Sequence, residues 1–313
     1  MISTPAMASV PTPAPASGDG EPRCAWCSAP IDPATPHPER RVPCARCGAQ
    51  TTWPVPTDAE LEAAYGTWYR PGAGRFSGVG DRLLRRLRGR LAARVDSIAP
   101  PGSVLDVGAG DGALLDALAV TGRGAVGLER HSERPDVREL ELAEYDEPCA
   151  AIVLWHTLEH LRDAGAALDH AASLLDPDGV VVIAMPNPAS IQARTFGDHW
   201  LALDLPRHLV HVPAATLRVR LGELGLRIER TSQLRGGQVV FGWLHGIVGT
   251  LPGHPDLYDA IRRPEARREP LTPARRLAIL AVGALALPLA ALGAALEAAL
   301  RRSGTVYVEA RRV

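Results

Sequence analysis

The sequence predicts an α/β protein with a doubly wound, mostly parallel sheet. Two observations lead to this prediction. From residue 102 onward, short apolar runs alternate with runs long enough for helices, and the first apolar run ends in a glycine-rich turn that opens directly into a helix. Such alternation places helices on both faces of a parallel sheet. The 313 residues suffice for one such domain and a small N-terminal module, and the net charge of −1 provides no basic field for nucleic acid.

Four cysteines near the N-terminus form two CxxC pairs: Cys24, Cys27, Cys44 and Cys47. Each pair makes a turn that points two thiolates at one tetrahedral ion, so the spacing predicts a structural zinc site without an open coordination position. A redox dithiol is the alternative. We assign residues 23–52 to this module and the proline-rich residues 1–22 to a disordered tail. The lone Cys149 is interpreted as a small core residue.

Residues 53–100 are predicted to be a helical linker or cap. Thr57 or Asp58 is expected to cap a first helix, because an acid follows in its first turn. A second helix, over residues 81–98, has an arginine-rich face that is either solvated or contacts phosphate or lipid headgroups. Its other face carries apolar side chains, namely Leu83, Leu84, Leu87, Leu91 and Val95.

The remaining residues, 101–313, contain six short apolar runs that predict strands. These runs cover residues 103–107, 125–128, 150–154, 179–185, 226–230 and 305–310. After the first run comes the turn DVGAGDG, residues 106–112, in which glycines let the backbone approach a ligand and the following helix offers free N–H groups. Glu129 ends the second run, where a carboxylate can accept both hydroxyls of a ribose. A nucleotide cofactor is therefore expected at this edge of the sheet.

Three motifs resemble those of class I S-adenosylmethionine-dependent methyltransferases, which have a Rossmann-like sheet with an antiparallel last strand. Residues 104–112 (VLDVGAGDG) are similar to the first motif, with an acid directly before a GxG turn. Residues 152–161 (IVLWHTLEHL) resemble the fourth-strand motif, and residues 175–179 (LDPDG) resemble the turn into the fifth strand. The cysteine module, with Tyr65 and Tyr69 downstream, resembles zinc ribbons that precede some of these enzymes.

The resemblance implies roles for individual residues. Glu129 would hold the ribose, and Trp155 and His156 would border the sulfonium. The acid and glycines of the first turn would bind the rest of the cofactor: Asp106, Gly108, Gly110 and Asp111. The sequence departs from the family before the fourth strand, where Cys149 and Ala150 replace an aromatic–acid pair, so Glu141 or Glu144 is the candidate for the adenine contact.

Residues 187–213 are predicted to form an insertion over the substrate. Its stretch WLALDLPRH, residues 200–208, resembles a W-x-x-L-D-x-P-R-H element that covers the active site in a subset of these methyltransferases. Methyl transfer to a hydroxyl or amine needs a base, and histidine titrates in the right range. We expect His208 to be this base, oriented by Asp204, with His160 as the second candidate. The alternative is that Asp204 pairs with His208 or Arg207 only to hold the loop.

A second insertion, residues 271–303, contains twenty uncharged residues, 277–296, flanked by arginines. Their length would span a bilayer, but a single span would separate the last strand from its sheet. The remaining alternatives are a helix that packs in the core or on a partner, and an interfacial hairpin bent at Pro288.

The predicted function is methyl transfer from S-adenosylmethionine to a small-molecule or lipid-linked acceptor by in-line displacement. An RNA-base methyltransferase that grips RNA through the zinc ribbon is the second hypothesis, and a non-catalytic cofactor-binding scaffold is the third. DNA is not an expected partner. We expect a cytoplasmic protein with peripheral contact to the inner membrane face through residues 277–296.

Overall fold

The computed structural model describes residues 21–34, 40–66, 76, 78–233 and 237–313. Nearly all of the tail predicted over residues 1–22, as well as Tyr69, lies outside these ranges.

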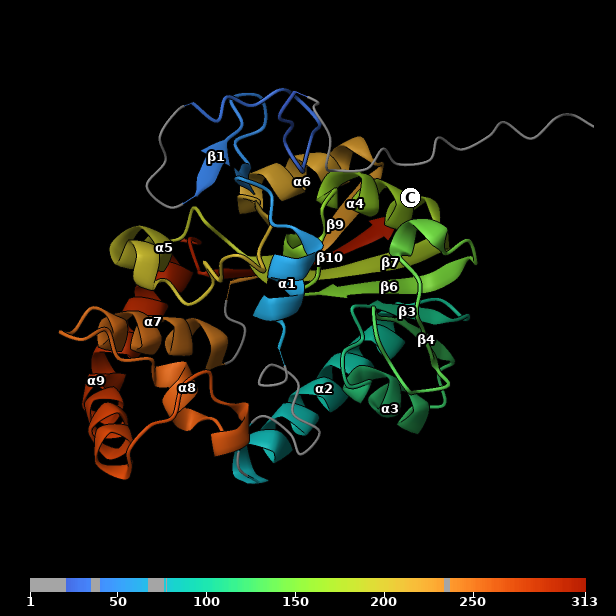
Figure 1. Cartoon of the computed structure of the whole chain (residues 1–313). Helices are drawn as coiled ribbons and strands as arrows, with labels where there is room; N and C mark the ends of the chain where they lie inside the picture. The colour runs from blue at the N-terminus through green and yellow to red at the C-terminus, as the bar shows by residue number, and fades with distance from the viewer. Residues whose placement is uncertain (1–20, 35–39, 67–75, 77, 234–236) are drawn as a thin grey trace, which may run out of the picture.

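A seven-stranded sheet forms the centre of the molecule, in the order β5-β4-β3-β6-β7-β10-β9 (Figure 1). All neighbouring strands run parallel except β10, which is antiparallel to β7 and β9. The strand order reverses between β3 and β6, which is where ligands bind in sheets of this kind. The predicted fold class, with its antiparallel last strand, is confirmed. The strands are β3 Val104–Val107, β4 Ala125–Leu128, β5 Val137–Arg138, β6 Cys149–Trp155, β7 Leu175–Pro186, β9 Leu226–Ser232 and β10 Thr305–Arg312.

Helices cover both faces of the sheet, and Figure 1 shows α4 and α6 above it and α2 and α3 below it. They are α2 Gly78–Ile98, α3 Ala113–Val120, α4 Ala164–Ser173 and α6 Ala214–Glu223. The predicted apolar face of α2 is only partly buried. Leu91 and Val95 are buried against the sheet, whereas Leu83 is 56% exposed and Leu84 and Leu87 are also exposed, because the first turns of α2 extend past the sheet.

The cysteine module is built into the same hydrophobic core. It contains the hairpin of β1 (Arg41–Pro43) and β2 (Gln50–Thr52), and β8 (Val210–His211) adds a third strand beside β2. Cys24, Trp26 and Cys44 pack in one cluster with side chains of α4 and α6. The segment predicted as a substrate insertion therefore joins the module by strand pairing, which the sequence did not indicate.

Helices α7 (Gly237–Gly249), α8 (Leu257–Ile261) and α9 (Pro273–Ala299) lie between β9 and β10. Of the alternatives considered for residues 277–296, the hairpin bent at Pro288 is not formed in this described segment, since α9 is one helix with Pro288 inside it. A glycine of α9, Gly293, lies against Trp243 of α7, and Glu297 accepts hydrogen bonds from the main chain and side chain of Gln192 at 2.6 and 2.7 Å. These contacts hold α9 against the domain.

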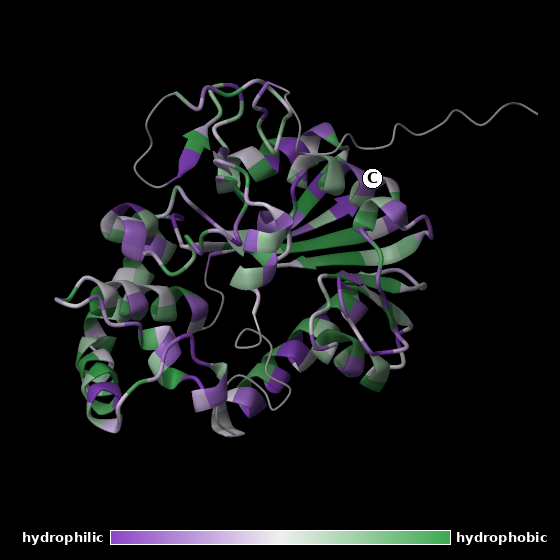
Figure 2. Cartoon of the chain, viewed as in Figure 1, coloured by the Kyte–Doolittle hydropathy of each residue, from purple (hydrophilic) through white to green (hydrophobic). Residues whose placement is uncertain are grey.

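By length and composition, α9 is the one helix in the described ranges that could cross a membrane. Helix α9 carries several exposed leucines: Leu277, Leu285, Leu287, Leu289, Leu292 and Leu296. Figure 2 shows hydrophobic colours along much of this helix.

The remaining short helices are α1 Asp58–Ala64 and α5 Ile191–Phe196, with single 3-10 turns at Leu142–Glu144, Leu158–His160, Gly197–His199 and Pro264–Ala266. Thr57 caps α1 in a reciprocal arrangement with Glu60, as predicted.

Candidate active site

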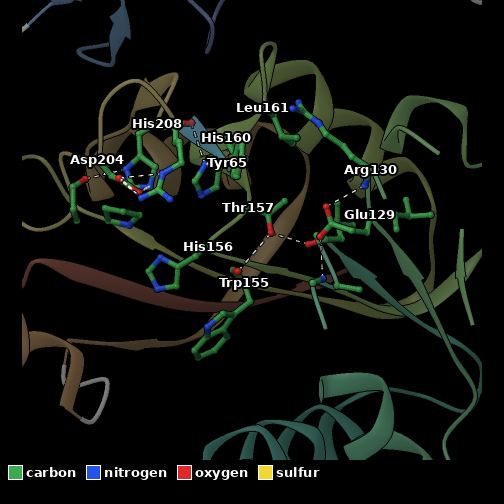
Figure 3. A pocket seen from close by; sticks show the side chains of 18 of the residues that line it. Tyr65, Glu129, Arg130, Trp155, His156, Thr157, His160, Leu161, Asp204 and His208 are labelled. Carbon is green, nitrogen blue, oxygen red and sulfur yellow. Dashed lines mark hydrogen bonds and ion pairs between the residues drawn. The ribbon is translucent and has the colours of Figure 1, made fainter. Parts of the chain in front are cut away.

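One cavity of about 3500 Å³ lies at the carboxyl ends of β3, β4 and β6. The cofactor residues expected from the sequence, apart from Asp106, line this same cavity, as do residues of the predicted insertion. Figure 3 shows His160, His208, Tyr65 and Asp204 grouped on one side, Glu129 on the other, and Thr157 between them. The lining residues among the predicted sites are Gly108, Gly110, Asp111, Glu129, Trp155, His156, His160, Asp204 and His208.

The glycine turn has a backbone that only glycine adopts without strain. Gly108 and Gly110 have φ values of +76° and +62°. A Cβ on Gly108 would approach the Thr157 hydroxyl to 2.8 Å, whereas a Cβ on Gly110 would meet no atom closer than 4.0 Å. Gly110 therefore presents its backbone to open space in the cavity, as a ligand-binding glycine must.

Glu129 lies beside this turn, as the ribose role requires. Its carboxylate accepts hydrogen bonds from the backbone N–H of Gly110 and of Arg130, both at 3.0 Å. These bonds fix the carboxylate at the mouth of the glycine turn. The adenine candidates differ from each other. Glu144 caps its own 3-10 turn by accepting from the N–H of Glu141 at 2.9 Å, while Glu141 lines the cavity.

Asp106 is the charged residue most affected by burial on the cofactor side. It is 4% exposed, and burial raises its pKa to about 7, with the neighbouring Glu129 and Asp111 carboxylates adding to the rise and the Arg88 guanidinium opposing it. Asp111 is exposed, and its carboxylate accepts from the N–H of Ala113 at 3.2 Å, at the start of α3. A cation bound near Asp106 would favour its ionised form.

Trp155 is the last residue of β6, His156 follows it, and both line the cavity. The Arg88 guanidinium lies over the Trp155 ring, 5.2 Å from its centroid. His156 has a φ of +54°, which is unusual for a residue with a side chain. Its Nδ1 lies 3.0 Å from Oε1 of Glu159, and its Nε2 lies 3.1 Å from the side-chain amide nitrogen of Gln238. His156 therefore donates to Glu159 and accepts from Gln238.

Glu159, His160 and His208 meet above the cavity, and we call them the roof cluster. Their ligand atoms all lie within 4.8 Å of one another. The two imidazole rings pack edge to face with centroids 4.7 Å apart. Burial, and then the neighbouring His208, lowers the pKa of His160 to about 4, so His160 is neutral at physiological pH.

Asp204 lies close to both Arg207 and His208. Residues 204–208 form a turn and not a helix. Asp204 Oδ1 accepts from Nη2 of Arg207 at 2.5 Å, whereas its Oδ2 is 3.7 Å from Nε2 of His208. The His208 ring is oriented instead by the carbonyl oxygen of Ala202, 2.9 Å from Nδ1. Asp204 therefore forms ion pairs with both Arg207 and His208, and its contact with Arg207 is the shorter one.

The four predicted zinc ligands also converge. Their sulfur atoms lie within 4.8 Å of one another, with Sγ distances of 3.7 Å between Cys24 and Cys47 and 3.6 Å between Cys27 and Cys44. Cys149 is buried in the core, away from this group.

Several contacts that shape the site are not indicated by the sequence. Thr157 donates to the carbonyl oxygen of Val107 at 2.7 Å and so ties β6 to the glycine turn. The Tyr65 hydroxyl lies 3.0 Å from Nδ1 of His160. These contacts, like those of Arg88 and Gln238, join segments far apart in the chain, so a motif search does not find them.

A model of the methyltransferase-domain family matches residues 79–231. The chain is 29% identical over 156 residues to the ubiquinone biosynthesis O-methyltransferase of Xylella fastidiosa (strain 9a5c). That alignment covers 42% of this chain and 63% of that enzyme, so the chain spans less than two thirds of this curated relative.

Solved structures also align with the chain. A SAM-dependent methyltransferase from Archaeoglobus fulgidus is 18% identical with a TM-score of 0.43, covering 72% of this chain and 94% of that one. The magnesium protoporphyrin IX methyltransferase of Synechocystis PCC 6803 with bound SAH is 20% identical with a TM-score of 0.40, covering 56% and 86%. The family match spans the glycine turn, Glu129 and the roof cluster. Residues 79–231 therefore match the methyltransferase-domain family.

Proposed function

We propose that the whole chain methylates an oxygen of a small-molecule or lipid-linked acceptor that has an extended apolar part. One observation carries this proposal: the cavity that holds the cofactor residues continues along apolar side chains of α2, α7 and α8. These are Leu83, Leu84, Leu87, Phe241, Tyr258 and Ile261. They offer a surface on which an apolar chain would lose contact with water.

In this proposal the protein contributes alignment and proton removal. Asp106, the glycine turn and Glu129 hold the cofactor, so that its methyl carbon lies near Trp155 and His156. The acceptor oxygen lies under the roof cluster, and its hydroxyl passes its proton to a histidine of the cluster or to water. The oxygen then attacks the methyl carbon in line with the breaking carbon–sulfur bond, and S-adenosylhomocysteine leaves. The name of the Xylella relative, an O-methyltransferase of ubiquinone biosynthesis, supports an oxygen acceptor.

The exposed leucines of α9 support contact with a membrane surface, on the cytoplasmic face. Leu285 is 82% exposed and Leu292 is 67% exposed, and arginines flank the helix at both ends. Single exposed leucines are ordinary, but a row of them along one helix is typical of an interaction surface. Because α7 contacts α9 and also lines the cavity, a membrane under α9 would lie close to the apolar end of the cavity.

Structural zinc at Cys24, Cys27, Cys44 and Cys47 belongs to the same proposal. Four buried or half-buried thiols from two CxxC turns fit a tetrahedral ion. With four sulfur ligands the ion would have no open position, so its role would be to stabilise the module and the β8 segment attached to it.

An acceptor series tests the proposed substrate class. Phenols and catechols with short, medium and long alkyl chains are offered with radiolabelled S-adenosylmethionine. We expect kcat/KM to rise with chain length, because each buried methylene contributes about 0.8 kcal/mol. Leu84→Asp combined with Leu87→Asp should remove this dependence, whereas Val120→Asp, at an exposed position of α3, should not. Equal rates along the series in the unmodified protein would contradict an apolar acceptor.

Vesicle flotation tests the membrane contact. The protein should float with vesicles containing anionic phosphatidylglycerol, and a variant with Leu285→Asp, Leu289→Asp and Leu292→Asp should remain at the bottom of the gradient. A control with Val120→Asp and Val219→Asp changes two exposed apolar side chains elsewhere and should still float. Failure of the unmodified protein to float at low salt would remove the membrane from the proposal.

A further inference from the structure

We propose that the roof cluster of Glu159, His160 and His208 is a second metal site, which binds one divalent transition-metal ion on the cavity side of the domain. It is separate from the four cysteines and uses two imidazole nitrogens and one carboxylate oxygen. Two segments far apart in the chain supply the ligands, and they are joined where the N–H of Leu209 donates to the carbonyl oxygen of Glu159 at 2.7 Å.

The first argument is the carboxylate of Glu159. Its residue is 1% exposed. One oxygen, Oε1, accepts the hydrogen bond from His156. The other, Oε2, is buried and has no hydrogen-bond partner within the described ranges. Leaving a buried carboxylate oxygen without a hydrogen-bond partner is costly, and native proteins almost always provide one. The unpartnered Oε2 of Glu159 is therefore the first indication that a ligand binds here.

The second argument is the orientation of the two histidines. Nδ1 of His160 lies 3.0 Å from the carbonyl oxygen of Arg207, and Nδ1 of His208 lies 2.9 Å from that of Ala202. A carbonyl oxygen only accepts, so in both rings Nδ1 carries the proton and Nε2 carries the lone pair. A backbone carbonyl on one ring nitrogen is the usual support of a metal-binding histidine.

The third argument is geometric. The ligand atoms of the three residues lie within 4.8 Å of one another. Tetrahedral coordination with bonds of about 2.1 Å needs ligand atoms roughly 3.4 Å apart, so small side-chain rotations would close the site around an ion. His160 and His208 both line the cavity. Three protein ligands would leave a fourth position open toward it, which is the arrangement of catalytic and not of structural sites.

The ligand set indicates the class of ion. Two imidazoles and a carboxylate suit zinc, iron(II) or cobalt(II) and are poor ligands for magnesium or calcium, which prefer oxygen. The role of the ion rests on the proposed function. An acceptor hydroxyl at the open position would lose its proton to water more readily, and its oxygen would then attack the methyl carbon as the carbon–sulfur bond breaks. His208 would act as a ligand in this role and not as the free base expected from the sequence.

Cobalt binding tests the site without requiring activity. Co²⁺ is added to the full-length protein that has been loaded with a single equivalent of zinc for the four cysteines, and visible absorption is recorded. We expect one equivalent to bind with the weak d–d bands of nitrogen and oxygen ligands and without the thiolate charge-transfer bands that replacement of zinc at the cysteines would give. Glu159→Gln and His208→Ala should each weaken this binding by at least roughly 10–100-fold, the loss that removal of a supporting residue alone causes. The control His254→Ala changes a histidine that stacks on His199 and should bind cobalt normally.

Anomalous diffraction from cobalt-soaked crystals of the unmodified protein provides a measurement that does not depend on how the variants fold. A cobalt peak between Glu159, His160 and His208 supports the site, and a peak only at the cysteines or elsewhere overturns it. Equal cobalt affinity in Glu159→Gln, His208→Ala and the control also overturns it. Methyl transfer that persists without an ion at the roof cluster would overturn the inference and leave the proposed function standing. An ion bound at the cluster without methyl transfer to any acceptor would support the metal site and contradict the proposed function.

Discussion

The hydroxyl of Thr52, in the cysteine module, donates a 2.6 Å hydrogen bond to the main-chain carbonyl oxygen of His208, in the roof of the cavity. The two residues are 156 positions apart, and the N–H of Thr52 also donates to the carbonyl oxygen of Leu209 at 2.9 Å. The module therefore holds the main chain of the roof in place. This contact links the module that carries the predicted zinc site to His208, a residue of the roof cluster.

Thr52→Val should lower kcat while leaving the affinity for S-adenosylmethionine unchanged. The valine keeps the shape of the side chain but leaves a buried carbonyl oxygen without its donor, at a cost of about 1–3 kcal/mol. Thr216→Val is the matched control, because the Thr216 hydroxyl also docks the module, on the carbonyl oxygen of Cys47 at 2.8 Å, without reaching the roof. Steady-state kinetics and calorimetry should show similar losses of stability in both variants but a loss of kcat only in Thr52→Val.

Replacing Cys24 and Cys27 by serine should remove one zinc per chain and destabilise the whole domain. Cys24 packs in the main hydrophobic cluster, and a structural zinc site contributes its binding energy to folding. Metal analysis, limited proteolysis and thermal unfolding measure this effect. Cys149→Ala, which changes a buried cysteine outside the quartet, should keep its zinc. A zinc-free protein with an unchanged unfolding temperature would contradict a structural role.

Glu129→Ala should weaken S-adenosylmethionine binding by about 1.5–3 kcal/mol, the scale of hydrogen bonds to a charged group. Gly110→Arg should abolish binding, because its side chain would occupy the open space beside the glycine turn. Isothermal titration calorimetry gives both values, with Glu265→Ala, on an exposed 3-10 turn, as the control. An unchanged dissociation constant in Glu129→Ala would exclude the ribose role.

Asp106 should make stability fall as pH rises from about 4 to about 7. Burial raises the pKa of Asp106 to about 7, above the value of about 3.9 expected in the unfolded chain. In this window the folded state holds a proton that the unfolded state has released, so the free energy of unfolding decreases with increasing pH. Calorimetric scans of the ligand-free protein and of Asp106→Asn should diverge over this window, with the variant relatively more stable at the upper end. Parallel curves would contradict the raised pKa.

The raised pKa of Asp106 also predicts how the affinity for S-adenosylmethionine depends on pH. S-adenosylmethionine carries a positive sulfonium and ammonium group, which favour the ionised carboxylate of Asp106. Its affinity should therefore increase as pH rises through about 7 in the unmodified protein and be lower and less pH-dependent in Asp106→Asn. Calorimetric titrations at several pH values measure this difference, and the absence of any difference between the two proteins would remove Asp106 from the binding site.

The sequence by itself determined the features that depend on local spacing. The glycine turn, the acid Glu129 at the end of the next strand and the two CxxC pairs are each read within a few residues, because backbone conformation and ligand geometry restrict which residues fit there. Apolar runs likewise determined six of the seven strands of the sheet, all except the two-residue β5, since burial on both faces requires a strand to be apolar.

Only the tertiary structure decided what depends on contacts between distant segments. It pairs β2 with β8, brings Glu159 beside His208, and places Asp204 between Arg207 and His208. It also exposes Leu83 of α2 and several leucines of α9, although the apolar face predicted for α2 and the uncharged run of α9 are equally typical of buried helices. A hydrophobic pattern states that a face is apolar, but whether another segment covers that face is determined by how the whole chain packs.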